Sequence, residues 1–394
     1  MGSFHNEHEP LGGKLVSKTT AVCAILALIA VFLLAKRMIL GLGSVTNLNN
    51  GYPWGIWIVY DVVIGTAFAC GGYAMAFLTY VMNKGEYHPL VRPALLASMF
   101  GYTLGGASII FDLGRWWNGW HILVPSYMQN GSVMFEVALC VMAYICVLWI
   151  EFTPAFLARF HKTALKKKLE KVLFVFIALG VLLPTMHQSS LGSLLVVFGY
   201  QIHPLWQTPI LPFLFLCSAV TMGFSIVVFE ALVGSSGFKR SIKHEIPQLA
   251  KLAKIVSGMM AVYLAVRFGD LIVRGDLGLA FTSGFKSLMF WLEIALFATP
   301  VVMFMKPANR HSKKALFVGA VSMLMGGAFY RLDAFLIGLQ TGNGWSYFPS
   351  VSELLVTFGI IAAEVLLYIV FVRKLPVFYT HALTPAELAA AHDK

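Results

Sequence analysis

Ten apolar segments, each long enough to cross a lipid bilayer, constrain this protein more than any other feature of its sequence. About 20 helical residues span the hydrocarbon core, and only helices or closed barrels satisfy every backbone polar group there. With 58% hydrophobic and 12% charged residues, the 394-residue chain has too little polar surface for a soluble globule. We therefore expect an all-α, polytopic integral membrane protein. Its expected spans are residues 20–41, 54–82, 93–113, 132–158, 171–186, 209–233, 252–272, 285–305, 315–338 and 351–373.

The fifth span is the least regular, because Pro184 interrupts it and further apolar sequence follows to about Tyr200. Proline removes a helical hydrogen bond, so we expect a break here, with the second piece open to a re-entrant course. The other connections are short, which leaves no room for a separate soluble domain. The expected division is an N-terminal segment over 1–19, a transmembrane domain over 20–375 and a C-terminal tail over 376–394.

The second half of the transmembrane domain weakly repeats the first. SVMFEVAL at 132–139 has a counterpart in SLMFWLEIAL at 287–296, and FDLGRW at 111–116 has one in RFGDLIVRG at 267–275. Four helices per copy give both copies the same orientation in the membrane. The prediction is two side-by-side four-helix bundles, built from helices 2–5 (about 52–200) and helices 6–9 (about 208–340), plus flanking helices.

The net charge of +11 at pH 7 would suit a nucleic-acid partner, but the distribution of the basic residues argues against one. If the N-terminus is cytoplasmic, 22 of the 29 Lys and Arg residues fall on the cytoplasmic side. This is the positive-inside bias of membrane proteins. We therefore expect a lipid membrane, no nucleic acid, and both termini in the cytoplasm.

Cysteine and histidine usage argues against a metal cofactor held by this protein. All five cysteines lie in apolar spans without a CxxC motif, which gives no framework for an Fe–S cluster. A membrane-bound b-type haem needs paired buried histidines, and only His187 lies at the end of a span while the others fall in loops. The sequence therefore predicts no haem and no Fe–S cluster in this protein.

Ionisable residues within apolar spans are functional candidates, because burying them in lipid is expensive. Asp61 lies about two turns below Trp54 and Trp57, whose simpler interpretation is anchoring at the membrane interface. Asp112 and Arg115 end the third span at the same side of the membrane, either as a structural ion pair or as functional groups.

Two further helices add polar residues to this outer layer. Glu136 lies one turn into the fourth span, and His187 and Ser190 close the fifth. Each residue alone could be a satisfied buried group. Their convergence from four successive helices at one depth indicates a binding site.

Polar residues of the later helices carry less functional weight. For most of those in the second copy, structural pairing is the favoured interpretation. Glu364, about midway along the last span, either holds a proton or simply faces the bundle. The residues of the second copy are Arg267, Asp270, Glu293, Arg331 and Asp333.

Several long strings resemble the NrfD/PsrC superfamily, and most closely its branch that serves [NiFe] hydrogenases. They are WGIWIVYDVVIGTAFACGGYA, HPLVRPALLASMFGYTLGG, LLPTMHQSSLGSL and IHPLWQTP, and the resemblance covers about Leu11 to Pro376. It implies a haem-free, quinone-reactive subunit in the bacterial inner membrane. Its expected partners are a ferredoxin-like Fe–S subunit and the small and large subunits of a periplasmic [NiFe] hydrogenase.

The resemblance implies menaquinone, or ubiquinone, as the substrate that receives two electrons and two protons, with proton translocation as an open possibility. His187 and Asp112 are the expected proton donors, and Arg115 is expected to keep Asp112 ionised or stabilise negative charge on the quinone. Asp61 and Glu136 are expected to relay protons, and the expected quinone site also includes Trp54, Trp57 and Ser190. The alternatives are a passive anchor for the hydrogenase and a secondary transporter.

Overall fold

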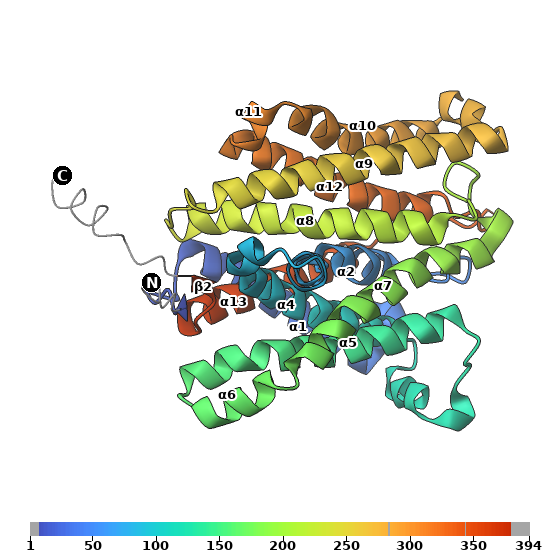
Figure 1. The fold of residues 1–394 in the computed structure, drawn as a ribbon. Coiled ribbons are helices and arrows are strands. Elements are labelled where there is room, and N and C mark those ends of the chain that lie inside the picture. Colours follow the sequence, from blue (N-terminus) through green and yellow to red (C-terminus); the bar gives the residue numbers. More distant parts are fainter. Residues whose placement is uncertain (1–7, 283, 343, 380–394) are drawn as a thin grey trace.

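The computed structural model describes residues 8–282, 284–342 and 344–379. Within this part of the protein, ten helices are long and apolar enough to cross a membrane, which confirms the predicted all-α membrane fold. Both described ends lie at one end of the helices, at the left of Figure 1. There β1 (His8–Glu9) pairs antiparallel with β2 (Phe378–Tyr379). We call this the terminal end, and the opposite end the distal end.

Nine of the ten spans are regular over most of their length. They are α1 (Lys18–Leu40), α4 (His88–Asp112), α5 (Val133–Arg159), α7 (Leu173–Phe198), α8 (Leu211–Gly237), α9 (Ile246–Arg274), α10 (Phe285–Met305), α12 (Lys313–Leu332) and α13 (Val351–Lys374). Short helices occupy the connections: η1 (Leu42–Ser44), η4 (Gly85–Tyr87), η5 (Trp116–Leu123), η6 (Pro125–Tyr127), α6 (Thr163–Glu170), η7 (Gly199–Gln201), η8 (Asp276–Phe281) and α11 (Pro307–Arg310).

The second span is irregular and is called helix 2 below. It consists of the π-helical segment η2 (Trp57–Ile64), α2 (Gly65–Phe68), α3 (Gly71–Ala76) and a second π-helical segment, η3 (Phe77–Val81). A third π-helical segment, η9 (Asp333–Ile337), extends α12. Such segments are rare and occur frequently at functional sites.

The break predicted in the fifth span is absent, and this expectation is corrected. α7 runs without interruption from Leu173 to Phe198 and contains Pro184 in its interior. Neighbouring helices can compensate for the hydrogen bond that a proline removes from a membrane helix, and α5 and α8 both pack along α7. His187 therefore lies within a continuous helix rather than at its end.

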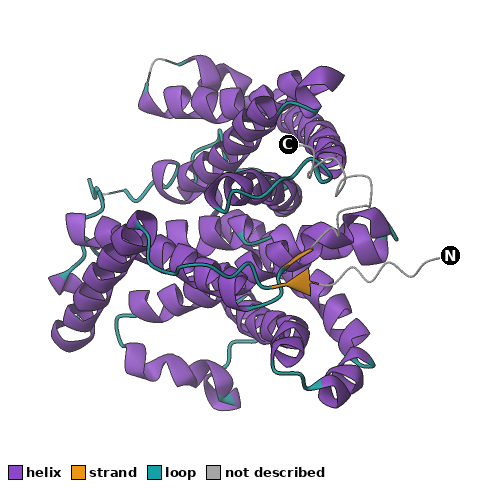
Figure 2. Cartoon of the chain, turned by 90° about the vertical axis from the view of Figure 1, so that its left-hand side faces the viewer, coloured by secondary structure: helices purple, strands orange, loops and turns teal. Residues whose placement is uncertain are grey.

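The contacts between helices bring helix 2, α4, α5 and α7 together as a first group, and α8, α9, α10 and α12 as a second. α1 pairs with α13, and α13 packs on α4 and η2. The second group lies above the first in Figure 1. Figure 2 shows the same arrangement turned by 90°, so that many of the helices are seen nearly end-on. α8 joins the groups by packing on α3 and α7.

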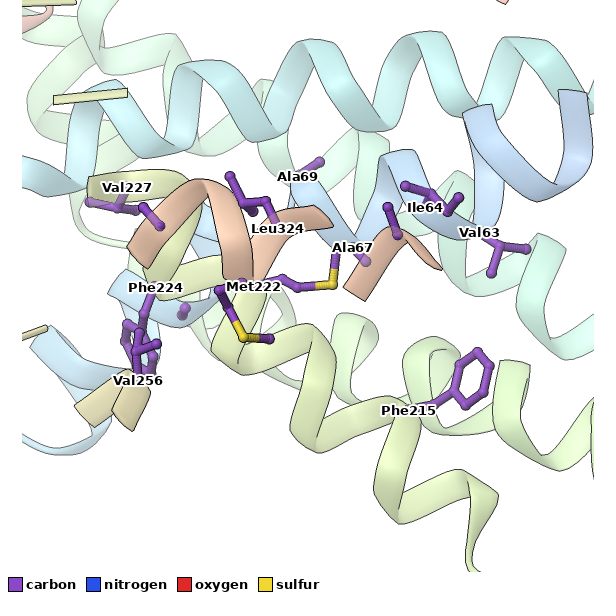
Figure 3. Packing of buried hydrophobic residues seen from close by; sticks show 14 of the residues in the cluster. Val63, Ile64, Ala67, Ala69, Phe215, Met222, Phe224, Val227, Val256 and Leu324 are labelled. Carbon is purple, nitrogen blue, oxygen red and sulfur yellow. The ribbon is translucent and has the colours of Figure 1, made fainter. Parts of the chain in front are cut away.

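Small residues allow this close approach. A side chain at Gly223 of α8 would place its Cβ 2.6 Å from the carbonyl oxygen of Cys70 in helix 2. Ala67 and Ala69 of helix 2 lie in the same apolar layer as Met222 and Leu324, as Figure 3 shows. Interfaces between membrane helices are typically built from such small residues.

Candidate functional site

A cavity of about 140 Å³ lies between helix 2, α4 and α13. Asp61 and Glu364 are the acidic residues that line it. Two glycines keep its wall thin: a Cβ at Gly105 would lie 2.8 Å from the Asp61 carbonyl oxygen, and one at Gly101 would lie 3.2 Å from Glu364 Oε1. The full lining is Tyr60, Asp61, Gly65, Phe68, Gly101, Leu104, Gly105, Ile360, Ile361 and Glu364.

Asp61 combines burial with an unused hydrogen-bonding atom. It lies in the π-helical segment η2, is 5% exposed, and its Oδ2 has no hydrogen-bond partner among the described residues. Ser108 of α4 and Thr357 of α13 lie beside it. A buried polar atom without a partner is costly, so this carboxyl group is available to a ligand or a proton in the cavity.

Glu353, in the first turn of α13, fixes helix 2 above the cavity. Its carboxylate accepts from the backbone N–H of Asn47 at 3.0 Å and from the hydroxyl of Tyr347 at 2.5 Å. Tyr347 in turn accepts from the backbone N–H of Ile56 at 2.9 Å. Burial and the bond to Glu353 raise the pKa of the Tyr347 phenol, so it stays a neutral donor.

Trp54 and Trp57 do not anchor the protein at a membrane interface, so this interpretation is wrong. They are only 3% and 1% exposed. The indole of Trp54 donates to the Phe335 carbonyl at 2.8 Å, and that of Trp57 donates to the Glu353 carbonyl at 3.1 Å. Both indole rings are therefore buried in contacts between helices, and neither lines the cavity.

Asp112 has a different cationic neighbour from the one expected. Arg115 is exposed, and no ion pair between it and Asp112 occurs within the described residues. Arg37 of α1 is instead fully buried and acts electrostatically on Asp112. Its guanidinium donates to the carbonyls of Phe111, at 2.6 Å, and Leu113. The expected pairing of Arg115 with Asp112 is therefore wrong. α4 ends at Asp112, and Arg115 lies beyond the helix end in an exposed segment.

His187 lies in a fully buried network at the centre of the first group. Its Nε2 contacts the Tyr102 hydroxyl at 3.1 Å and the amide nitrogen of Gln188 at 3.0 Å, and its Nδ1 contacts the Leu183 carbonyl at 3.2 Å. Gln188 also donates to Thr66 of helix 2 at 3.1 Å. The predicted site residue is therefore held entirely by protein groups.

Two other predicted site residues, Ser190 and Glu136, lie on α7 and α5. Ser190 of α7 donates to Glu136 Oε1 of α5 at 2.8 Å. Thr66 connects this side to the cavity, because its methyl group lies 3.7 Å from the Cβ position of Gly105, which lines the cavity. Of the predicted residues, Asp61 lines the cavity, with Asp112 acting on it electrostatically. His187 and the Ser190–Glu136 pair lie in contacts between helices.

The second group shows the favoured pairing for most of its polar residues, with Arg331 and Asp333 as exceptions. Neither carboxylate oxygen of Asp333 has a hydrogen-bond partner within the described residues. Arg267 lies 3.9 Å from Glu293, and Arg274 pairs with Asp270 at 2.9 Å. Arg331 takes part in no ion pair within the described residues. It donates to Gln188 Oε1 of the first group at 3.2 Å, so it connects the two groups.

Sequence patterns did not select Tyr102 or Thr66, and they gave Arg331 little weight. One signal was present: Gly101 and Gly105 form a GxxxG pattern, which marks close approach of another helix. Tyr102 lies inside this pattern. Arg331 could not have been connected to Gln188 from the sequence, because 143 positions separate them.

The family model described as "Polysulphide reductase, NrfD" matches residues 44–341. The protein is 46% identical to the probable Ni/Fe-hydrogenase 2 b-type cytochrome subunit of Escherichia coli, over 94% of its own length and 95% of the relative. It is 27% identical to the integral membrane subunit of menaquinone reductase from Nitratidesulfovibrio vulgaris, over 86% of each protein. It is 28% identical to a polysulfide reductase subunit of Wolinella succinogenes, over 72% of its own length and 93% of the relative.

The prediction that the protein binds no haem is wrong in the light of the first of these names, which describes a b-type cytochrome subunit. The prediction rested on the lack of paired histidines in the spans. The described side chains do not fit bis-histidine ligation: among them His187 is the one fully buried histidine, and protein groups contact both of its ring nitrogens. We assign no axial ligand.

Proposed function

Because the protein belongs to the NrfD family of membrane subunits, we propose that it passes electrons between an Fe–S partner subunit and a quinone. The relatives are named as a b-type cytochrome subunit of Ni/Fe-hydrogenase 2, the integral membrane subunit of a menaquinone reductase, and a chain of polysulfide reductase. At 46% identity over nearly the whole length, the hydrogenase relative favours a [NiFe] hydrogenase complex as the electron source. The proposed substrate is menaquinone in the bacterial inner membrane, with the terminal end cytoplasmic and the distal end periplasmic.

The cavity beside Asp61 is the observation that carries this proposal. Its volume of about 140 Å³ is close to the roughly 150 Å³ of an engineered cavity that admits benzene, so a quinone ring could enter with modest movement of the walls. Phe68, Leu104 and Ile360 supply apolar walls, and Asp61 and Glu364 supply polar contacts. Such a mixture is typical of small-molecule sites.

The two carboxyl groups suit the chemistry of quinone reduction. Each quinone carbonyl oxygen takes up one proton when the ring accepts two electrons, so the site must supply protons as well as hold the ring. Asp61, with its free Oδ2, is the proposed donor at the distal side of the cavity, with Asp112 behind it. Glu364 is the proposed polar contact deeper in the membrane.

The buried network supports the opposite wall. His187 and Tyr102 form a hydrogen-bonded pair, and Glu136 with Ser190 extends the polar path along α5 and α7. We propose that these groups hold and exchange protons, which reach the cavity by way of Thr66. Trp54, Trp57 and Arg115 have no direct part in this proposal.

Filling the cavity tests the proposal directly. Gly65 lines the cavity, and a Cβ there would meet only the carbonyl oxygen of Tyr60, at 3.4 Å. Gly65→Leu should therefore occupy the ring position without disrupting the helices. In the purified complex we expect hydrogen-dependent reduction of a soluble naphthoquinone to fall at least about tenfold, while Asp61→Asn lowers it by about 10²–10⁴. Reduction of a dye that draws electrons upstream should be unchanged.

The matched control is Gly258→Leu, on α9 outside the site, where no atom lies within 4 Å of the added Cβ. It should leave both rates unchanged. Normal naphthoquinone reduction in Gly65→Leu and Asp61→Asn, with the Fe–S subunit still co-purifying, would contradict the proposal. The protein would then be a passive membrane anchor.

A further inference from the structure

Arg331 is a fully buried cation whose position is unusual. It extends from α12 in the second group and reaches the first group. Buried arginines are normally paired with carboxylates, yet within the described residues its partners are neutral. They are Gln188 Oε1 at 3.2 Å, Ser218 Oγ at 3.2 Å, the Phe215 carbonyl at 3.3 Å, the Gly327 carbonyl at 3.5 Å and the Met222 sulfur at 3.3 Å.

The contact with Gln188 determines how that side chain is oriented. A guanidinium group only donates hydrogen bonds, so the Gln188 atom that faces Arg331 must be the carbonyl oxygen. The amide nitrogen then points the other way and donates to Thr66, at 3.1 Å, and toward His187 Nε2, at 3.0 Å. Arg331 thereby removes the usual ambiguity of an amide orientation.

The orientation of Gln188 in turn determines the tautomer of His187. Because the amide N–H group points at Nε2, that nitrogen must be an acceptor without a proton. On the other side of the ring, Nδ1 faces the Leu183 carbonyl at 3.2 Å, and a carbonyl can only accept. Both contacts require the neutral imidazole with its proton on Nδ1. The lone pair of Nε2 is then shared between the Gln188 amide and the Tyr102 hydroxyl, which lies 3.1 Å away.

We propose that Arg331 is a positioning residue that holds Gln188, and through it His187, in the form that accepts a hydrogen bond from Tyr102 at Nε2. Without Arg331 the Gln188 amide is free to turn its oxygen toward His187. The ring would then face acceptors on both sides and would be drawn toward a proton on Nε2. The second group therefore controls the protonation pattern of a residue in the first.

Solid-state NMR of the full-length protein in lipid bilayers, labelled with [¹³C,¹⁵N]histidine, tests this inference without any activity assay. The sequence has 11 histidines, and the His187 signal is the one lost in His187→Gln. We expect the wild-type signal to show a protonated Nδ1 and an unprotonated Nε2. The opposite tautomer, or a doubly protonated ring, in the wild-type protein would overturn the proposal.

Four variants then separate the positioning role of Arg331 from a general effect on stability. Gln188→Glu keeps a partner for Arg331 but presents only acceptors to His187, so a proton should appear on Nε2. In Arg331→Met the wild-type pattern should likewise be lost, and Arg331→Lys should restore part of it. Arg267→Met, which removes the other fully buried arginine of the second group, should leave the His187 signal unchanged. An unaltered His187 signal in Gln188→Glu contradicts the proposal even if Arg331→Met does not fold.

The consequence for activity rests on the proposed function. If His187 serves quinone reduction, Arg331→Met should lower the naphthoquinone rate about tenfold or more and leave the dye rate unchanged. A changed tautomer with a normal naphthoquinone rate would support the positioning role of Arg331 but contradict the proposed participation of His187 in quinone chemistry.

Discussion

Arg37 is fully buried near the distal end of α1, where its guanidinium donates to two carbonyl groups at the end of α4. The last carbonyls of a helix have no partners within the helix, and a cation there also complements the helix dipole. Arg37 thus caps α4, balances Asp112 and ties α1 to the first group. Arg115, although closer to Asp112 in the sequence, does none of this.

Replacing each arginine separately tests this distinction. Arg37→Met leaves two carbonyls at the end of α4 without their donor, so we expect a loss of about 1–3 kcal/mol of stability, seen as a lower thermal unfolding temperature in detergent. Arg115→Met removes an exposed side chain and should change stability by no more than about 0.5 kcal/mol. Equal effects of the two substitutions would show that Arg37 is not the structural cation at this helix end.

Among the helices, helix 2 connects the cavity, the His187 network and the second group. Its π-helical segment η2 presents Asp61 to the cavity, its α2 segment supplies Thr66 to Gln188, and its α3 segment lies against α8. The π-helical turns of η2 change which residues face each neighbour, because each such turn inserts an additional residue.

The crossing of helix 2 and α8 depends on a residue without a side chain. In Gly223→Ala, the new Cβ would lie 2.6 Å from the Cys70 carbonyl oxygen and 2.9 Å from Ala74 Cβ. We expect this overpacking to lower stability by about 1–3 kcal/mol, measured by thermal unfolding. Gly258→Ala on α9 is the control, since no atom lies within 4 Å of its Cβ. That substitution should be neutral or stabilise by about 0.5–1 kcal/mol.

On the scale of the whole molecule, ten spans place both described ends on one side of the membrane, where β1 and β2 pair. The distribution of 22 of 29 basic residues predicts that this side is the cytoplasm. Reporter fusions after Lys168 and after Lys314 should therefore report a cytoplasmic location, and a fusion at Gln207 a periplasmic one. A periplasmic signal at Lys168 or Lys314 would reverse the orientation and move the cavity's distal end to the cytoplasm.

The two helix groups are connected through the site. The first group contains Asp61, His187 and the cavity, yet the amide that orients His187 is held by Arg331 of the second group. α8, the helix of the second group that packs on the first, contributes the Phe215 carbonyl and Ser218 to the Arg331 contacts. Removing the second group would therefore alter the site as well as the stability of the protein.

The features that follow from local composition could be predicted from the amino-acid sequence alone. Apolar length predicted the ten spans, because about 20 apolar residues in a helix cross the hydrocarbon core and satisfy their own backbone polar groups. The cost of burying charge selected Asp61, Glu136 and His187, all of which lie among polar contacts or beside the cavity. Long motif strings indicated the family, and the match to its model confirms it.

Which of these residues contact one another depends on how the helices pack in three dimensions. Pro184 predicted a break, but packing by α5 and α8 keeps α7 continuous. The position of Trp54 and Trp57 near the start of a span suggested anchoring at the membrane interface. In the structure both are buried, and their indoles donate to carbonyls of η9 and α13. Arg37 and Arg331 reach partners 74 and 143 positions away in the sequence. Such contacts depend on how helices cross, and the apolar pattern of a membrane helix specifies its length far better than the face it presents to a neighbour.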